Sequence, residues 1–291
     1  MKNVLFTGVC TALITPFLNG EVNYPMVEQL LRRQMEAGIR SAVICGTTGE
    51  SATLSDREKL ELFRRAKQYT GDRCRIIAGT GSNNTEHAIA LSKAAQDSGV
   101  DALLVVSPYY NKATEEGLVA HYRAVAGAVE IPVIVYNVPS RTGVDISVRV
   151  YQYLSQIPNI VGVKEASSDI TKVTKILAAC PEDFAVWSGN DDQAAAVISL
   201  GGAGVISVLS NVLPEETQAM VSAALDGDFD TASDLQKKML PLTEALFAEV
   251  NPIPVKAAMK LIGYDCGECR LPLTAPSPAT LKKLKRLLLA N

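Results

Sequence analysis

The sequence predicts an α/β fold in which eight parallel strands close into a (β/α)8 barrel, the TIM barrel, followed by a C-terminal appendage of three helices. Eight short apolar or β-branched runs recur along the 291 residues, spaced by about the length of one strand–helix unit. The segments between them carry apolar residues at helical spacing, as in Met26-Leu30-Leu31-Met35. An open doubly wound sheet is the alternative, but it normally has a glycine-rich phosphate loop after the first strand, where this chain has Thr15-Pro16-Phe17.

Strands of a parallel sheet are buried on both faces, so each should appear as a continuous apolar run rather than an alternating one. Each run is short enough for a strand, and turn residues or a helical pattern follow it. In chain order the expected strands are Gly8–Ile14, Ser41–Cys45, Arg75–Ala78, Ala102–Val106, Pro132–Tyr136, Ile160–Val163, Phe184–Trp187 and Gly204–Ser207.

The strand pattern stops at Asp226-Gly227-Asp228, and only helical patterns follow. The prolines of Asn251-Pro252-Ile253-Pro254 should separate two helices, because the residue before a proline disfavours the helical conformation. We therefore expect a barrel domain over residues 1–225 and a helical domain over residues 226–291. The three expected helices of the second domain are Phe229–Val250, Ile253–Ile262 and Ala279–Leu289.

Composition argues against several classes of partner and location. With 28 basic and 31 acidic residues the net charge is −3, so neither nucleic acid nor an anionic membrane surface is an expected partner. The apolar stretch Val4–Leu18 resembles a secretory signal, but threonines and Pro16 interrupt it and no cleavage site follows, so a buried strand is expected. No apolar run has the length of a membrane helix. Six dispersed cysteines suggest reduced thiols, and hence a cytoplasmic protein.

Metal and serine-hydrolase chemistry are not expected, because the chain has only two histidines, His87 and His121. Both fall in predicted amphipathic helices, where packing at the surface or an interface is the expected role. Cys266 and Cys269 have the spacing of metal ligands, but no second pair accompanies them. We interpret them as packing residues, with a zinc or redox role as the alternative.

Polar residues collect where the predicted strands end, and in a barrel those ends surround the functional site. The second strand leads into Gly46–Ser51, whose backbone N–H groups and threonine hydroxyls could hold a carboxylate. Tyr109 and Tyr110 follow the fourth strand, and Tyr136 ends the fifth. The guanidinium of Arg141 beyond it also suits a carboxylate. The plain alternatives are a structural turn, packed phenols and a solvated charge.

Lys164 gives the sharpest signal, because lysine rarely ends an apolar strand. Alternation along the strand places Lys164 on one face with Gly162 and Ile160, and Glu165 on the other. If that first face is the barrel interior, apolar walls disfavour an ammonium and retain a neutral amine that can attack a carbonyl. This predicts Schiff-base chemistry, and an exposed lysine just past its strand is the alternative.

Taken together, these motifs resemble those of the dihydrodipicolinate synthase family, which are pyruvate-dependent class I aldolases. The resemblance covers essentially the whole chain. It implies a TIM barrel that condenses pyruvate with L-aspartate 4-semialdehyde on the route to diaminopimelate and lysine, without a metal or an organic cofactor. The residues that carry it are Gly8–Phe17, Gly46–Ser51, Tyr136–Arg141, Lys164 and Asn251–Lys256.

The resemblance also implies roles for individual residues. Lys164 would form the imine with pyruvate, and Tyr136 would donate and accept protons in a relay with Thr47 and Tyr110. In this family the residue matching Tyr110 reaches in from a neighbouring subunit, so a homo-oligomer is implied, and we expect a tetramer built as a dimer of dimers. The implied substrate contacts are Thr48 for the pyruvate carboxylate, Arg141 for the semialdehyde carboxylate, and Ile206, Gly189 and Asn190 along the pocket.

Two other functions remain open. Related lyases that act on N-acetylneuraminate or 2-keto-3-deoxy sugar acids keep the lysine, the tyrosine and the glycine-rich turn, although Arg141 and the tail motif favour the semialdehyde. A non-catalytic binding protein on the same barrel is the alternative from a different class. The presence of Lys164, Tyr136, Thr47 and Tyr110 argues against it.

A feedback site for lysine at the subunit interface is also implied. Regulated members of the family carry an acid where this chain has His87, and histidines where it has Asp56 and Lys59. Without that acid the amine of lysine loses a partner, so we expect weak or no inhibition. The matching positions that are retained are Ser51, Ala52, Asn83 and Tyr109.

Overall fold

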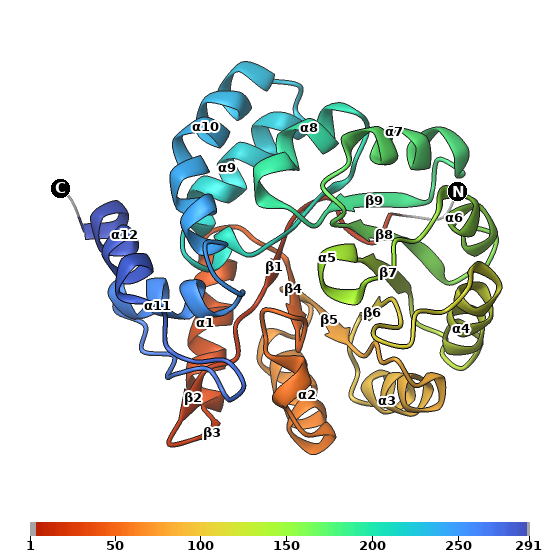
Figure 1. Ribbon diagram of the computed structural model, residues 1–291, viewed down its shortest axis with the longest axis horizontal. Coiled ribbons are helices and arrows are strands. Elements are labelled where there is room, and N and C mark those ends of the chain that lie inside the picture. Colours follow the sequence, from red (N-terminus) through yellow and green to blue (C-terminus); the bar gives the residue numbers. More distant parts are fainter. Residues whose placement is uncertain (1–3, 290–291) are drawn as a thin grey trace.

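The computed structural model describes residues 4–289 and confirms the predicted (β/α)8 barrel, with eight parallel strands in a closed ring and helices around it (Figure 1). Every predicted strand is present, and the ends differ from the predicted ones by one or two residues at most. Around the ring the order is β1-β10-β9-β8-β7-β6-β5-β4. The barrel strands are β1 (Gly8–Ala12), β4 (Ser41–Ile44), β5 (Arg75–Gly79), β6 (Ala102–Val106), β7 (Val133–Asn137), β8 (Ile160–Glu165), β9 (Ala185–Ser188) and β10 (Gly204–Ser207).

Helices alternate with the strands and bury one face against them. Their starts are well defined: Ser55 caps α2 through a capping box, in which its hydroxyl accepts from the Glu58 N–H and the Glu58 carboxylate accepts from the Ser55 N–H. The helices of the barrel are α1 (Tyr24–Glu36), α2 (Asp56–Thr70), α3 (Thr85–Asp97), α4 (Glu115–Gly127), α5 (Pro139–Thr142), α6 (Val148–Leu154), α7 (Ile170–Ala179), α8 (Ala194–Ser199) and α9 (Pro214–Leu225).

Several short elements were not predicted. β2 (Phe17–Leu18) and β3 (Glu21–Val22) form a small antiparallel hairpin between β1 and α1. Their two-residue length gives no periodic signal in the sequence. Three short 3₁₀ helices follow strands: η1 (Ser51–Thr53), η2 (Asp191–Gln193) and η3 (Leu209–Asn211).

Side chains fill the barrel interior. One buried apolar cluster draws residues from all eight barrel strands and is separate from the larger cluster between strands and helices. Trp187 of β9 is its largest member, and it stacks on Phe6 with ring centroids 4.7 Å apart. Because Phe6 precedes β1, this stack closes the N-terminal end of the barrel. Any accessible site inside the barrel must therefore open at the other end.

A bulge in β8 corrects one prediction. Ile160 was expected to share the inner face with Lys164, but it packs in the outer cluster, while Val161 belongs to the inner one. The register explains this: Val133 pairs with Ile160 and the next residue, Ile134, with Gly162, so Val161 has no paired partner. Beyond this bulge the alternation holds. Gly162 faces inward, where an added Cβ would lie 2.8 Å from the Trp187 ring.

Three further helices follow the barrel: α10 (Phe229–Leu246), α11 (Ile253–Leu261) and α12 (Pro278–Leu289). Figure 1 shows them together on one side of the barrel. α10 packs against α8 and α9, and its apolar residues join the cluster beneath the barrel helices, so the division into two domains stays a prediction. None of the helices within residues 4–289 combines the length and apolar character needed to cross a membrane.

Candidate active site

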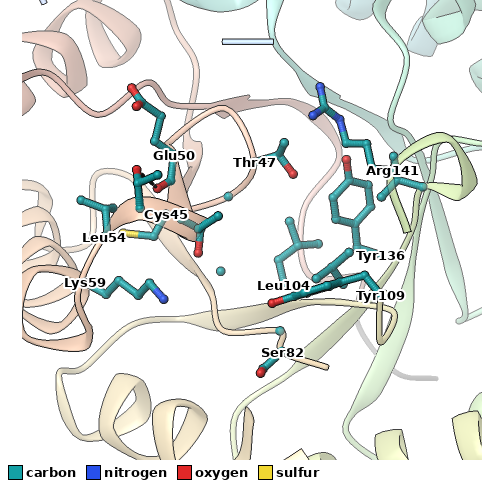
Figure 2. A pocket seen from close by; sticks show the side chains of 18 of the residues that line it. Cys45, Thr47, Glu50, Leu54, Lys59, Ser82, Leu104, Tyr109, Tyr136 and Arg141 are labelled. Carbon is teal, nitrogen blue, oxygen red and sulfur yellow. Dashed lines mark hydrogen bonds between the residues drawn. The ribbon is translucent and has the colours of Figure 1, made fainter. Parts of the chain in front are cut away.

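A cavity of about 700 Å³ opens at the C-terminal ends of β4 to β7 (Figure 2). Its floor includes Leu104 and Val106 of β6. Tyr136 and Arg141 line one end, and Figure 2 shows Lys59 at the opposite end. Residues 250–252 and 272–273 of the C-terminal segment complete the wall, so the site is built from both ends of the chain.

Lys164 lies inside the barrel beside this cavity. It is 5% exposed, and its Nζ lies 4.4 Å from the ring centroid of Tyr136, which does line the cavity. β7 and β8 align these two residues as direct partners in the sheet. No described carboxylate comes within ion-pairing distance of the Lys164 amine. The interior position predicted from strand alternation is thus correct, although Lys164 is not itself among the lining residues.

A buried polar network lies on the outer face of the same two strands, β7 and β8. The Glu165 carboxylate accepts hydrogen bonds from Asn137 Nδ2 at 2.9 Å, from the Ser167 N–H at 2.8 Å and from the Tyr151 hydroxyl at 3.0 Å. Burial raises the pKa of the Tyr151 phenol well above its usual value, so it remains a donor. Because Asn137 follows Tyr136 and Glu165 follows Lys164, this network fixes the strand ends that carry both inward side chains.

Backbone hydrogen bonds within the Gly46–Ser51 turn after β4 fix its conformation. Gly49 N–H donates to the Gly46 carbonyl and Glu50 N–H to the Thr47 carbonyl. Thr47 lines the cavity, as expected. Thr48 is buried instead, and its hydroxyl accepts a 2.9 Å hydrogen bond from Asn251 Nδ2.

Arg141 lies on the short helix α5 and lines the cavity, as expected. It is exposed, and one of its guanidinium nitrogens donates to the backbone carbonyl of Asn251 at 3.3 Å. Asn251 therefore touches both Thr48 and Arg141, and its own Oδ1 is buried without a partner. The sequence had indicated Asn251 only as part of a tail motif, without a role at the site.

Besides Lys164 and Thr48, four more expected site residues do not line the cavity. Ile206 is fully buried in the inner cluster. Gly189 and Asn190 follow β9, and Asn190 is engaged with Ser168 at 3.1 Å. Tyr110 is 90% exposed on a left-handed backbone with φ of 70°, so its own chain does not bring it into the site.

Most of the expected regulatory positions line the cavity, namely Ser51, Ala52, His87 and Tyr109, while Asn83 does not. His87 Nε2 lies 2.8 Å from Asp56 Oδ2, and Lys59 Nζ lies 3.5 Å from Asp56 Oδ1. The hydrogen bond with His87 is the main cause that lowers the pKa of the Asp56 carboxyl. Asp56, His87 and Lys59 are thus linked in one charged group.

The surroundings of His121 and of the pair Cys266 and Cys269 indicate packing roles. His121 is 5% exposed, its Nδ1 lies 3.0 Å from Thr85 Oγ1, and burial lowers its pKa. Burial raises the pKa of Cys266 and of Cys269 to about 12, which keeps both thiols protonated. Within residues 4–289 no three metal-binding side chains are grouped as a site.

Comparison with known proteins gives a consistent result. The model of the family described as "Dihydrodipicolinate synthetase family" matches residues 5–291. The 4-hydroxy-tetrahydrodipicolinate synthase of Acetivibrio thermocellus is 46% identical, over 99% of this chain and 98% of its own length. Two solved structures match with TM-scores of 0.96 and 0.95, each covering 98% of both chains. They are the Acinetobacter baumannii dihydrodipicolinate synthase complexed with pyruvate, 42% identical, and the Cyanidioschyzon merolae enzyme with lysine bound, 41% identical.

These matches confirm the resemblance found in the motifs, and they span nearly the whole chain. The matched regions cover nearly the whole chain, and their overall identity is above 40%. The chain therefore belongs to the dihydrodipicolinate synthetase family.

Proposed function

We propose that this chain catalyses the 4-hydroxy-tetrahydrodipicolinate synthase reaction, the condensation of pyruvate with L-aspartate 4-semialdehyde towards diaminopimelate and lysine. The observation that carries the proposal is the buried amine of Lys164 against the ring of Tyr136, beside the cavity at the C-terminal end of the barrel. The name of the Acetivibrio relative and the pyruvate bound in the Acinetobacter structure support the choice of reaction.

The chemistry begins when the Lys164 amine adds to the keto carbon of pyruvate and the adduct loses water to give an imine. A methyl proton leaves, and the resulting enamine carbon forms the new C–C bond with the aldehyde carbon, whose oxygen takes up a proton. The amine of the second substrate then adds to the imine carbon, closes the ring and displaces Lys164. One water is released, and the lysine returns as a free amine.

The surrounding residues suit the steps of this sequence. The ring of Tyr136 lies beside the amine, and its hydroxyl would move protons to and from the reacting carbon and oxygen. Thr47 lines the cavity at the start of the turn, where it can extend that relay. Thr48, which follows the lining residue Thr47, would hold the pyruvate carboxylate, and the exposed guanidinium of Arg141 in the lining would hold the carboxylate of the second substrate.

We also propose that the active enzyme is a homo-oligomer, a tetramer built as a dimer of dimers. The supporting observation is Tyr110, which the resemblance places in the proton relay but which is 90% exposed on its own chain. A phenol held outward on a left-handed backbone is suited to enter the cavity of a second copy. The free thiols of all six cysteines, which lie within residues 4–289, are consistent with a reducing compartment such as the cytoplasm.

Reduction with borohydride in the presence of pyruvate tests the proposal. The chain should gain one reduced pyruvate adduct on Lys164, seen by peptide mass spectrometry, and should turn over aspartate semialdehyde with pyruvate. N-acetylneuraminate and 2-keto-3-deoxy sugar acids should be poor substrates, because a cationic guanidinium suits a carboxylate better than sugar hydroxyls. Adduct formation with sugar-acid cleavage would instead identify a related lyase, and no adduct at all would refute the Schiff-base assignment.

A further inference from the structure

A fully buried ion pair joins the C-terminal segment to the turn that follows β4. Glu50 Oε1 lies 2.8 Å from Lys256 Nζ, and these side chains are 0% and 3% exposed. The second carboxylate oxygen accepts from the Arg270 backbone N–H at 2.8 Å. Lys256 Nζ also donates to the Glu268 carbonyl at 3.0 Å and lies 4.3 Å from the ring centroid of Phe17. The Glu50 carboxylate and the Lys256 ammonium therefore each have a further bonding partner besides the other.

The position of this pair in the chain ties it to the site. Glu50 has a left-handed backbone, with φ of 55°, and its N–H donates to the carbonyl of Thr47. Lys256 lies on α11, just after Asn251, which donates to the Thr48 hydroxyl. Lys256 on α11 and Asn251, which precedes that helix, thus bind the turn at two points, Glu50 and Thr48. Glu50 is among the residues that line the cavity, and Figure 2 shows its carboxylate directed away from Leu104.

Stability alone does not account for such a pair. Removing two charges from water costs free energy that their mutual attraction only roughly offsets, so an apolar replacement of both is often neutral or stabilising. What the pair does provide is a fixed geometry, because both groups are satisfied in only one arrangement. Glu50 lies three residues after Thr47. A salt bridge with this cost at that position is better explained by the fixed backbone geometry that it gives to the Gly46–Ser51 turn.

We propose that Glu50 and Lys256 are positioning residues for the pyruvate carboxylate, acting through the backbone of the turn that carries Thr47 and Thr48. The C-terminal helices would then be part of the substrate site rather than only its cover. This inference rests on the proposed function, because it assumes that pyruvate binds at this turn. Neither Glu50 nor Lys256 touches substrate in this scheme.

The test is the double variant E50Q/K256M, which removes both charges at nearly constant shape and leaves no lone buried charge. The matched control is K260M, on the same helix, whose lysine is 66% exposed and pairs with the exposed Asp265. Two quantities are measured: the pyruvate concentration that half-saturates borohydride trapping, and KM and kcat for each substrate. We expect KM and half-saturation for pyruvate to rise roughly ten- to a hundredfold in E50Q/K256M, with KM for the semialdehyde and the melting temperature nearly unchanged. K260M should match the wild type.

A folded E50Q/K256M with wild-type half-saturation for pyruvate would overturn the inference, as would equal increases in KM for both substrates, which indicate general loosening. If the double variant does not fold, E50Q alone decides: a several-fold selective rise for pyruvate supports the inference, and an unchanged value refutes it. Failure of the proposed function is distinguishable, since the wild type itself would then form no adduct with pyruvate.

Discussion

The amine of Lys164 and the phenol ring of Tyr136 face each other inside the barrel, with Nζ 4.4 Å from the ring centroid. Their strands pair directly at these two residues, so the backbone hydrogen bonds of the sheet set the separation of the two groups. Loop motions therefore change access to the site and leave this pair in place. A nucleophile and a proton-transfer group held in this way need little rearrangement when substrate arrives.

Replacing Lys164 with methionine should abolish the pyruvate adduct and lower kcat/KM by about a thousandfold or more. The amine of Lys172 also lies near the end of β8, but it is paired with Asp145 and Glu165 and does not line the cavity. The same change should raise the free energy of unfolding by about 1 kcal/mol, since an amine without an ion pair is costly to bury. Kinetics, borohydride trapping and chemical denaturation check the two effects. A trapped adduct in K164M would show that the nucleophile is another residue.

The network behind the strands gives a second prediction. In Y151F the Glu165 carboxylate loses one of its hydrogen-bond donors in a buried place, so the free energy of unfolding should fall by about 1–3 kcal/mol. kcat should fall as well, because Glu165 and Asn137 hold the ends of β8 and β7. The control is Y153F on the same helix, whose phenol is exposed. Equal stability of Y151F and Y153F in denaturant would contradict this account.

Subunit mixing tests the proposed role of Tyr110. K164M and Y110F should each be nearly inactive as pure proteins. A hybrid of the two should recover part of the activity, because one of its cavities then combines an intact Lys164 with an intact Tyr110 from the other subunit. Co-expression with two affinity tags isolates the hybrid for assay. Full activity of pure Y110F, or an inactive hybrid, would argue against a shared site.

The fold was largely predictable because its signals are local. Continuous apolar runs located every barrel strand, and alternation correctly placed Lys164 and Glu165 on opposite faces of β8. The misplaced residue, Ile160, lies before a bulge whose extra residue leaves no mark in composition. The two-residue strands of the hairpin escaped for a similar reason, since so short a segment has no periodicity.

The site was predictable only in part, because its completion depends on distant contacts. Lys164, Tyr136 and Thr47 were found as polar residues at strand ends. The bond between Thr48 and Asn251 joins residues 203 positions apart, and the Glu50–Lys256 pair spans a similar distance. A single sequence gives no sign of such partners. The proposed role of Tyr110 likewise depends on a second copy of the chain, whose contacts a single sequence does not indicate.

Lysine should inhibit this enzyme weakly or not at all. At the far end of the cavity the buried Lys59 adds a cation, and His87, bonded to Asp56, lies at the position where the resemblance implies an acid in regulated members. The ε-ammonium of a bound lysine would then lack its partner and face a like charge. Initial rates with increasing L-lysine measure this, and H87E should increase sensitivity. Half-inhibition of the wild type at micromolar lysine would contradict the prediction.

Acid stability should depend on Glu58, which binds the tail through Arg270. Two hydrogen bonds, of 3.0 and 2.6 Å, join its carboxylate to the guanidinium, and they lower the pKa of Glu58 from 4.5 to about 2. A carboxyl with a lower pKa in the folded state stabilises the fold when ionised. That contribution is complete above about pH 4.5 and is lost as the pH falls from 4.5 towards 2.

In E58Q the free energy of unfolding should therefore fall at pH 7, and its decline between pH 5 and about pH 2 should become shallower than in the wild type. The matched control is E61Q on the same helix. The pKa of Glu61 is also lowered to about 2, but its partners Arg64 and Arg65 are exposed neighbours on α2, where solvent screens the pairs and no distant segment is held. Urea unfolding across this pH range, at low and high salt, measures both variants. If E58Q and E61Q changed the decline of the free energy of unfolding between pH 5 and about pH 2 equally, local helix pairs, and not the link to Arg270, would set the acid stability of the fold.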